Sequence, residues 1–186
     1  RFSLAAAAVD YNNDGFIYLH VINDFGYDEV YINNKGIYFT EQSKQLGLAD
    51  RGNGMNISIL DLNNNGYLDL VVSNYETAPK IFQNMAPKTN HWIKIKLVST
   101  TSNSYAIGAK VSIKTTQGMF NKLVSAGSQY MSQEDTTLTF GLADMKEIQS
   151  VSVSWPGGKT IHYKGPFNSR QLLNIYQDGI VKKNKL

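Results

Sequence analysis

The stretch that most constrains the fold is the nine-residue segment Asp61-Leu-Asn-Asn-Asn-Gly-Tyr-Leu-Asp69. Oxygen-bearing side chains occupy its first, third, fifth and ninth positions, and glycine occupies the sixth. A hard cation such as Ca²⁺ takes roughly six to eight oxygen ligands, which a short loop supplies only by turning sharply. Gly66 permits this turn, because glycine adopts positive φ without a steric penalty. The spacing predicts a Ca²⁺ site made by Asp61, Asn63, Asn65, the Tyr67 carbonyl and Asp69.

The residues on both sides of this loop indicate strands. Met55–Leu60 precedes the loop and Tyr67–Val72 follows its turn, and both are short runs rich in β-branched and apolar residues. An EF-hand loop begins in the same way, but it lies between helices and ends with a glutamate that is absent here. We therefore interpret the segment as a calcium loop inside a β-hairpin. The alternative is a plain Asn/Asp/Gly turn that holds no metal.

The loop pattern also occurs once upstream, as Asp10-Tyr-Asn-Asn-Asp-Gly15, at a constant spacing of 51 positions. The alignment extends past the loop, because Leu19 falls on Leu70 and Val30–Asn33 falls on Ile81–Asn84. Self-similarity at about fifty residues, with several short strands in each repeat, is typical of propeller blades. The alignment with Met55–Leu60 also makes the alanine-rich run before Asp10 a strand, although alanine favours helices.

Residues 1–86 resemble FG-GAP/VCBS-type repeats, the calcium-loop blades of integrin α-subunit propellers and of bacterial surface proteins. The two loops carry this resemblance, together with Asn23-Asp-Phe-Gly26 and Gly52-Asn-Gly-Met55. It implies two blades of a partial β-propeller, with Ca²⁺ bound at the loops.

The first loop departs from the family at its ninth position, where Tyr18 replaces the usual aspartate. This loop retains Asp10, Asn12, Asp14 and the Phe16 carbonyl as candidate ligands. A neutral tyrosine is a poor calcium ligand, so we expect the second loop to bind more tightly. Asp24, in the following turn, is a candidate replacement for the missing carboxylate.

The boundary between the two halves is expected at Pro87, within a polar run, so that the domains are 1–86 and 87–186. Beyond it, alternating strands recur about every ten residues, which favours a β-sandwich or barrel. A possible short helix or irregular crossover is expected at Thr40–Leu46. The expected strands of the second half are Trp92–Leu97, Ala109–Ile113, Phe120–Ser125, Leu138–Phe140, Val151–Trp155, Thr160–Tyr163 and, as the last, Leu172–Tyr176.

The second half resembles the ASPIC/UnbV domain, which commonly follows FG-GAP-type repeats. In place of the family's Arg-Asp pair this chain has Ser104-Tyr105, which puts any role of that pair in doubt. The fold class expected for the whole chain is all-β. The motifs that carry the resemblance are Asn90-His-Trp92, Ala106-Ile-Gly-Ala109, Ser125-Ala-Gly-Ser128, Tyr130-Met-Ser-Gln133, Phe140-Gly-Leu142 and Val153-Ser-Trp-Pro-Gly-Gly158.

Charge is divided unevenly along the chain. The net charge is +3, but residues 1–86 carry ten acidic and five basic side chains, whereas residues 87–186 carry five and thirteen. Such asymmetry suggests two modules with different partners. The chain has no cysteine, which excludes disulfides and thiolate metal sites, and it contains no apolar run of membrane-spanning length. It begins with Arg1 rather than methionine, which suggests a processed chain or a fragment.

The sequence favours no enzymatic activity. His20, His91 and His162 lie far apart and lack zinc-site spacing, and neither a nucleophile elbow nor a phosphate-binding glycine loop is present. Nucleic-acid binding is weakly supported, because the lysines lack an aromatic stacking platform.

We expect a calcium-stabilised module for adhesion or assembly, located outside the cell or at its surface, where Ca²⁺ is abundant. Its partner is expected to be another protein or a second copy, since about two blades cannot close a ring. Self-association would build a filament. One alternative is a polysaccharide-binding module. The other is an accessory domain of a biosynthetic enzyme. The stacking residues of the first alternative would be Tyr105, Tyr130, Trp155 and Tyr163, unless these rings pack in the core or at sheet edges.

Overall fold

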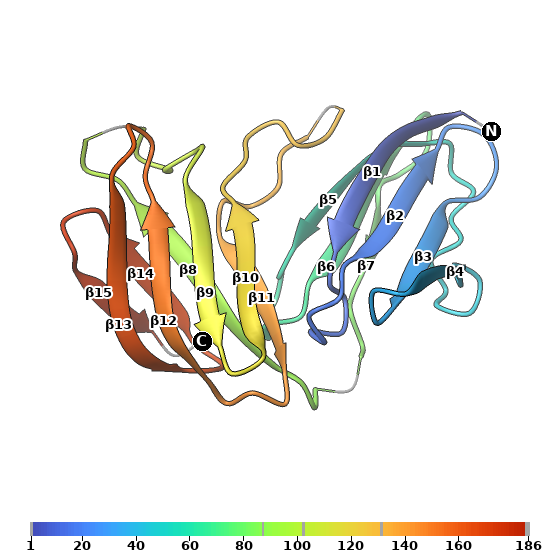
Figure 1. Cartoon of the computed structure of the whole chain (residues 1–186). Helices are drawn as coiled ribbons and strands as arrows, with labels where there is room; N and C mark the ends of the chain where they lie inside the picture. The colour runs from blue at the N-terminus through green and yellow to red at the C-terminus, as the bar shows by residue number, and fades with distance from the viewer. Residues whose placement is uncertain (1, 87, 102, 131, 185–186) are drawn as a thin grey trace. The chain divides into compact units, whose positions relative to one another are not determined.

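The computed structural model describes residues 2–86, 88–101, 103–130 and 132–184, so the predicted boundary residue Pro87 lies outside the described residues. These residues form fifteen strands and no helix, which confirms the predicted all-β class. No helix long and apolar enough to span a membrane is found in the described part of the chain. The strands belong to two compact units, each built from two sheets (Figure 1).

The first unit, Arg1–Pro87 with Gly127–Glu134, contains the two repeats. Each repeat forms an antiparallel sheet whose strands follow chain order, as expected for consecutive hairpins. The alanine-rich run is a strand, as the repeat alignment predicted. The four-stranded sheet comprises β1 (Ser3–Val9), β2 (Tyr18–Asn23), β3 (Glu29–Asn34) and β4 (Tyr38–Glu41). The three-stranded sheet comprises β5 (Gly54–Leu60), β6 (Asp69–Asn74) and β7 (Lys80–Phe82).

The two sheets of the first unit share one hydrophobic core, in which β1 packs on β5. Alternate residues of β1 point into it, and their small alanines allow β5 to approach closely. Gly54 of β5 also lies close to β2, since a Cβ atom there would be 2.5 Å from the Ile22 side chain. The buried members of this core are Ala5, Ala7, Val9, Ile22, Ile57, Ile59, Leu70 and Val72.

A polar junction accompanies this contact. The Asp28 amide donates to the Asp50 carbonyl at 2.8 Å, which joins the β2–β3 turn to the segment before β5. The Asp28 side chain is buried, and its Oδ1 accepts the Asn23 amide at 2.9 Å. Its Oδ2 is buried without a hydrogen-bond partner. The junction therefore holds a carboxylate whose desolvation is incompletely compensated.

Charges around the junction act differently on its two carboxyl groups. Burial raises the pKa of Asp28 to about 6, and the nearby Asp50 carboxylate adds to this effect. Burial also acts on Asp50, but hydrogen bonds from Lys80, Asn74 and the Arg51 amide hold the pKa of Asp50 below its ordinary value. Asp50 is therefore ionised and paired at neutral pH, whereas Asp28 carries the cost of burial.

An unexpected segment belongs to the first unit. Gly127–Glu134 follows Ala126 and precedes Asp135, which both belong to the second unit. The Ser132 hydroxyl donates to the Ile57 carbonyl of β5 at 2.9 Å. The predicted boundary at Pro87 places these eight residues in the second half, because they lie between strands of that half.

The second unit is a sandwich of two four-stranded sheets around one core. Both sheets contribute to this core, and the strand Leu172–Tyr176 lies parallel to the strand His91–Val98. One sheet has the order β10-β9-β12-β13, with β9 (Lys110–Thr115), β10 (Gly118–Leu123), β12 (Glu147–Ser154) and β13 (Thr160–Asn168). The other has the order β11-β8-β14-β15, with β8 (His91–Val98), β11 (Leu138–Ala143), β14 (Leu172–Tyr176) and β15 (Val181–Asn184).

Most predicted strands are present, and the differences have local causes. Leu172–Tyr176 is not the last strand, because the Asp178-Gly179 turn leads into β15, whose polar Lys-Lys-Asn sequence hid it. Thr40–Leu46 forms no helix; β4 continues to Glu41 and turns follow. Gly157 and Gly158 form the hairpin turn between β12 and β13, with positive φ at both residues.

The junction predicts a pH-dependent stability difference. Asp28→Asn should raise the free energy of unfolding by about 1–2 kcal/mol at pH 7.5, since it removes a buried charge and keeps an acceptor for the Asn23 amide. A folded-state pKa raised from 3.8 means that the stability contributed by Asp28 is full below 3.8 and is lost as the pH rises through about 6. The gain should therefore be larger at pH 7.5 than at pH 5, by about 1 kcal/mol. Urea denaturation measures this, with exposed Glu147→Gln as the control; an equal gain at both pH values would contradict the burial cost.

Candidate metal centre

The second loop turns around the side chain of its first residue. Asp61 Oδ1 accepts the Asn65 amide at 3.0 Å, and Asp61 Oδ2 accepts the Gly66 amide at 2.6 Å. Asn64 and Gly66 adopt positive φ, 57° and 87°, which glycine and asparagine tolerate best. The turn required by the sequence pattern is therefore present, and the leading carboxylate holds its backbone in place.

The intermediate ligand candidates of this loop lie close to the same backbone. Asn63 Oδ1 accepts the Asn65 amide at 3.1 Å, and Asn65 Oδ1 accepts the Tyr67 amide at 2.8 Å. Asn63 is exposed, whereas the Tyr67 side chain is buried. The side-chain oxygens of positions one, three and five are thus gathered on the amides of one short turn.

Asp69 closes the loop as the first residue of β6. Its side chain is fully buried, Oδ2 accepts the Leu62 amide at 2.9 Å, and Oδ1 accepts the Asn84 amide at 2.8 Å. These two hydrogen bonds offset the cost of burying the Asp69 side chain. Asp69 therefore ties the start of the loop to the chain that follows β7.

The first loop repeats this backbone. Asp10 Oδ1 accepts the Asp14 amide at 3.2 Å, and Asp10 Oδ2 accepts the Gly15 amide at 2.9 Å. Positive φ recurs at Asn13, 59°, and at Gly15, 89°. Asp14 Oδ1 accepts the Phe16 amide at 2.9 Å, as Asn65 Oδ1 does for Tyr67. The alignment predicted from the sequence is therefore a structural equivalence.

Two features distinguish the first loop. The Asn12 amide group donates to Asp14 Oδ2 at 2.9 Å, so both Asp14 oxygens accept hydrogen bonds from within the loop. The closing residue Tyr18 is buried, and burial, followed by the Asp14 and Asp10 carboxylates, raises the pKa of Tyr18 to about 12. Its hydroxyl is neutral at pH 7 and supplies no charge to a cation.

Asp24 does not replace the missing carboxylate. It follows β2, whereas the first loop precedes β2, so the six residues Tyr18–Asn23 separate them. A strand of that length spans roughly 20 Å. The expectation that Asp24 compensates for Tyr18 is wrong because the extended strand carries it to the other end of the sheet.

The donor chemistry of the loops fits a hard cation. Among the described residues, no group of three or more His, Cys, Asp or Glu side chains is placed to hold a metal. A cation at either loop would therefore depend on asparagine and main-chain oxygens as well as aspartates, which suits Ca²⁺ rather than Zn²⁺. His20, beneath the first loop, is buried with Nδ1 2.8 Å from the Tyr11 hydroxyl. Burial lowers the pKa of His20 to about 4, so it is neutral at pH 7.

The four aromatic residues predicted for polysaccharide stacking fall into two pairs. Trp155 and Tyr163 are 2% and 4% exposed and belong to the core of the second unit. Tyr105 and Tyr130 are 62% and 59% exposed. Trp155 and Tyr163 therefore pack in the core, and of the four only Tyr105 and Tyr130 have rings exposed to solvent.

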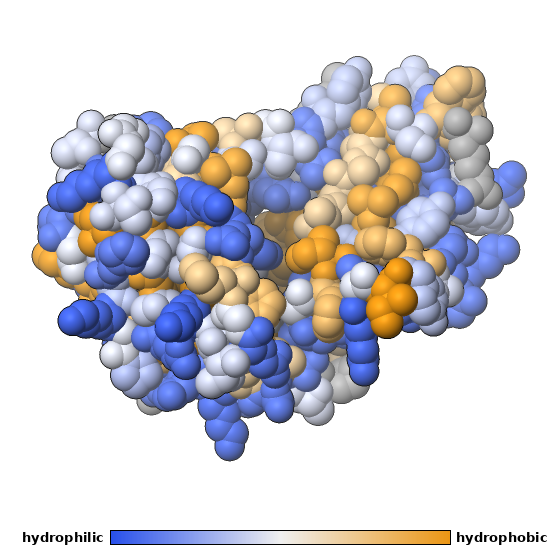
Figure 2. Space-filling view, viewed as in Figure 1, coloured by the Kyte–Doolittle hydropathy of each residue, from blue (hydrophilic) through white to orange (hydrophobic). Residues whose placement is uncertain are grey.

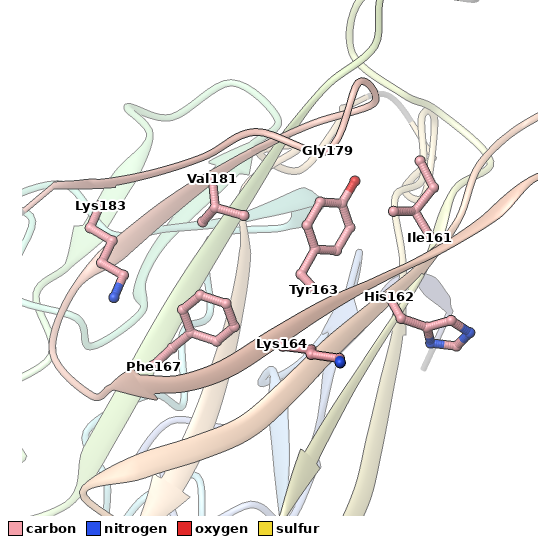
Figure 3. Close-up of a pocket in the computed structure, with 8 residues that line it drawn as sticks. All are labelled: Ile161, His162, Tyr163, Lys164, Phe167, Gly179, Val181 and Lys183. Atoms are coloured by element: carbon pink, nitrogen blue, oxygen red, sulfur yellow. The ribbon is translucent and has the colours of Figure 1, made fainter.

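A groove of about 370 Å³ on the second unit lies between the edge strands β13 and β15 (Figure 3). Tyr163 lines it, but the Tyr163 hydroxyl donates to the Tyr176 carbonyl at 2.8 Å. Lys183 Nζ lies 5.4 Å from the centroid of the Phe167 ring, a cation–π contact. The aromatic rings of this groove are thus engaged within the protein rather than available for stacking on a sugar.

Sequence reasoning missed two asparagines that join the loops. The Asn13 amide group donates to the Gly66 carbonyl at 3.0 Å, and the Asn84 amide group donates to the Tyr11 carbonyl at 2.7 Å. The alignment of Asn33 with Asn84 was a partial signal, because each donates to the equivalent carbonyl of its own repeat, Ile17 or Leu68. Nothing in the sequence distinguishes Asn13 from its counterpart Asn64.

Comparison with known proteins supports the two-part organisation. Residues 10–72 match the family model described as FG-GAP-like repeat, and residues 99–179 match that described as ASPIC and UnbV. Cartilage acidic protein 1 of Mus musculus and of Homo sapiens is 30% identical over 118 residues, which cover 61% of this chain and 18% of each relative. The Xenopus tropicalis protein of the same name is 30% identical over 112 residues. The chain spans less than a fifth of the length of these relatives.

The Asp69 side chain should stabilise the folded protein even when no metal is bound. Asp69→Ala leaves the Leu62 and Asn84 amides without their acceptor, and the loss of each part-buried hydrogen bond to a carboxylate costs about 1–3 kcal/mol. We expect Asp69→Ala to lower the free energy of unfolding by about 3 kcal/mol in EDTA. Exposed Asn63→Ala is the control and should change it by less than about 1 kcal/mol. Equal losses for the two variants would contradict the structural role of Asp69.

Proposed function

We propose that this chain, in which FG-GAP-like repeats precede an ASPIC/UnbV domain, is a calcium-stabilised extracellular module for adhesion or assembly. The observation that carries the proposal is the pair of equivalent loops, whose aspartate and asparagine oxygens gather on sharp turns. The FG-GAP-like match includes both loops. Ca²⁺ at millimolar concentration outside a cell suits such loops of moderate affinity.

Calcium would contribute charge neutralisation and cross-linking. Asp61 holds two loop amides, and its carboxylate oxygens are the charged donors that would bind the ion. Asn63, Asn65 and the Tyr67 carbonyl would complete one side of the site, with Asp69 at its close. In the first loop, Asp10, Asn12, Asp14 and the Phe16 carbonyl would play these roles. The Asn12–Asp14 hydrogen bond and Tyr18 favour weaker binding there.

A free sheet face supports assembly. On the four-stranded sheet, Ala8 pairs with Leu19, Leu19 pairs with Tyr31, and these residues lie on the face opposite the core. Leu19 is 39% exposed and Phe39, on the same face, is 54% exposed. Figure 2 shows apolar side chains gathered over β1 and β2 on this face of the first unit. Such a face is suited to packing against another sheet, in a partner protein or in a second copy.

The other functions have less support. Polysaccharide binding would use the exposed Tyr105 and Tyr130, which remain candidates, but not the buried Trp155 and Tyr163. The family matches are to an FG-GAP-like repeat and to ASPIC and UnbV, and the FG-GAP-like repeats favour a binding or structural role over catalysis. We therefore place adhesion or assembly first, polysaccharide binding second and the role of an enzyme accessory third.

Calcium should stabilise the protein measurably. If the dissociation constant lies about 100-fold below the free calcium concentration, the free energy of unfolding should rise by about 2.7 kcal/mol. Asp61→Ala should remove most of this calcium-dependent gain, and Asp10→Ala should remove less. Thermal denaturation in CaCl₂ and in EDTA measures both effects. A melting temperature that is the same in CaCl₂ and EDTA would contradict calcium stabilisation.

Self-association should depend on the free sheet face. We expect the mass measured by light scattering after size exclusion to rise with protein concentration in millimolar CaCl₂. Leu19→Lys should abolish the rise, because it places a charge on the apolar face. Leu123→Lys, on the exposed strand β10, is the matched control. A monomeric mass at all concentrations would remove self-association and leave only a different protein as partner.

A further inference from the structure

Asn13 and Asn64 occupy the same position of the two loops and have nearly the same backbone, with φ of 59° and 57°. Their side chains differ sharply. Asn13 is 1% exposed, whereas Asn64 is exposed to solvent. The Asn13 amide group donates to the Gly66 carbonyl of the second loop at 3.0 Å. The first loop therefore contacts the second through a residue whose counterpart points into water.

The hydrogen bond from Asn13 reaches the glycine at the turn of the second loop. Gly66 has φ of 87°, and glycine loses more conformational freedom than other residues when it is ordered. Its amide is held by Asp61 at 2.6 Å, and its carbonyl is held by Asn13. The next carbonyl, that of Tyr67, is a ligand candidate. Because the Gly66 amide and the Gly66 carbonyl are both held by hydrogen bonds, the backbone that leads to the Tyr67 carbonyl has a fixed orientation.

Asn84 makes a second connection between the loops. Its side-chain amide group donates to the Tyr11 carbonyl at 2.7 Å and to the Leu68 carbonyl at 3.1 Å. Its backbone amide donates to Asp69 Oδ1 at 2.8 Å. Asn84 thus holds the closing end of the second loop and attaches it to the first. The second loop is supported at its turn by Asn13 and at its close by Asn84.

We propose that the first loop is a brace for the second, and that Asn13 is a positioning residue which raises the affinity of the second loop for a divalent cation with oxygen ligands. This inference rests on the proposed calcium function. The loop with the weaker ligand set supplies the support, and the loop with the closing carboxylate receives it.

The physical basis is preorganisation. A loop that is ordered before binding loses less conformational entropy when the cation arrives, so it binds more tightly with the same ligands. One hydrogen bond is worth about 0.5–1.5 kcal/mol, which corresponds to a change in the dissociation constant of about two- to ten-fold. The effect belongs to the second loop, although the side chain belongs to the first.

The test compares Asn13→Gly with Asn64→Gly in the full chain. Both substitutions keep a residue that tolerates positive φ and remove one side-chain amide, so their backbone effects match. Calorimetric titration with CaCl₂ should show about two- to ten-fold weaker binding at the second loop for Asn13→Gly and little change for Asn64→Gly. Asp61→Ala identifies the signal of the second loop by removing it. Equal affinities for the two glycine variants would overturn the brace.

A measurement without metal separates this inference from the calcium proposal. In EDTA, amide hydrogen exchange at Asn65–Tyr67 should be faster in Asn13→Gly than in Asn64→Gly, because only the former frees the Gly66 carbonyl. If Asn13→Gly fails to fold, the isosteric pair Asn13→Asp and Asn64→Asp gives the same comparison, since aspartate cannot donate to a carbonyl. Unchanged exchange would overturn the brace itself. Failure of the wild type to bind Ca²⁺, with the exchange difference present, would overturn the calcium function and the affinity role but retain the mechanical support.

Discussion

The first unit depends on one interaction made twice, the capture of two backbone amides by the leading aspartate of each loop. Asp10 and Asp61 each accept hydrogen bonds from residues four and five positions later. These bonds fix the length of the turn, and the turn length fixes the register of the hairpin that follows. The alternation of buried residues on β1, β2, β5 and β6 follows from that register, and the shared core follows from the alternation.

The two repeats have diverged in complementary ways. In the first loop both Asp14 oxygens accept hydrogen bonds from within the loop, whereas in the second loop Asp69 ties the start of the loop to the end of its repeat. Close packing at Gly54 and the junction of Asp28 with Asp50 hold the sheets together at a cost in buried charge. Stability in this unit therefore comes from interactions between repeats as well as within them.

Much of the fold was predictable from periodicity. The spacing of Asp10 and Asp61 located both loops, and strand alternation located most of the sandwich. What escaped prediction depends on tertiary placement. Asn13 and Asn64 are the same residue in the same motif, and only the neighbouring sheet makes one buried. The sequence around Asp28 is that of an ordinary turn, and only the folded chain places Asp50 beside it. The polar sequence of β15 has no alternation of apolar and polar residues that would predict a strand.

Residues 127–134 have a practical consequence for anyone who divides this chain. These residues belong to the first unit, whereas the segments on both sides of them, 88–126 and 135–186, belong to the second. No single cut in the polypeptide therefore separates the two units. A truncated chain ending at residue 86 would lack the Ser132 hydroxyl that reaches the Ile57 carbonyl, and one beginning at residue 88 would carry a segment without its docking strand. An exchange of either unit for that of another protein would therefore need junctions near residues 87, 126 and 134.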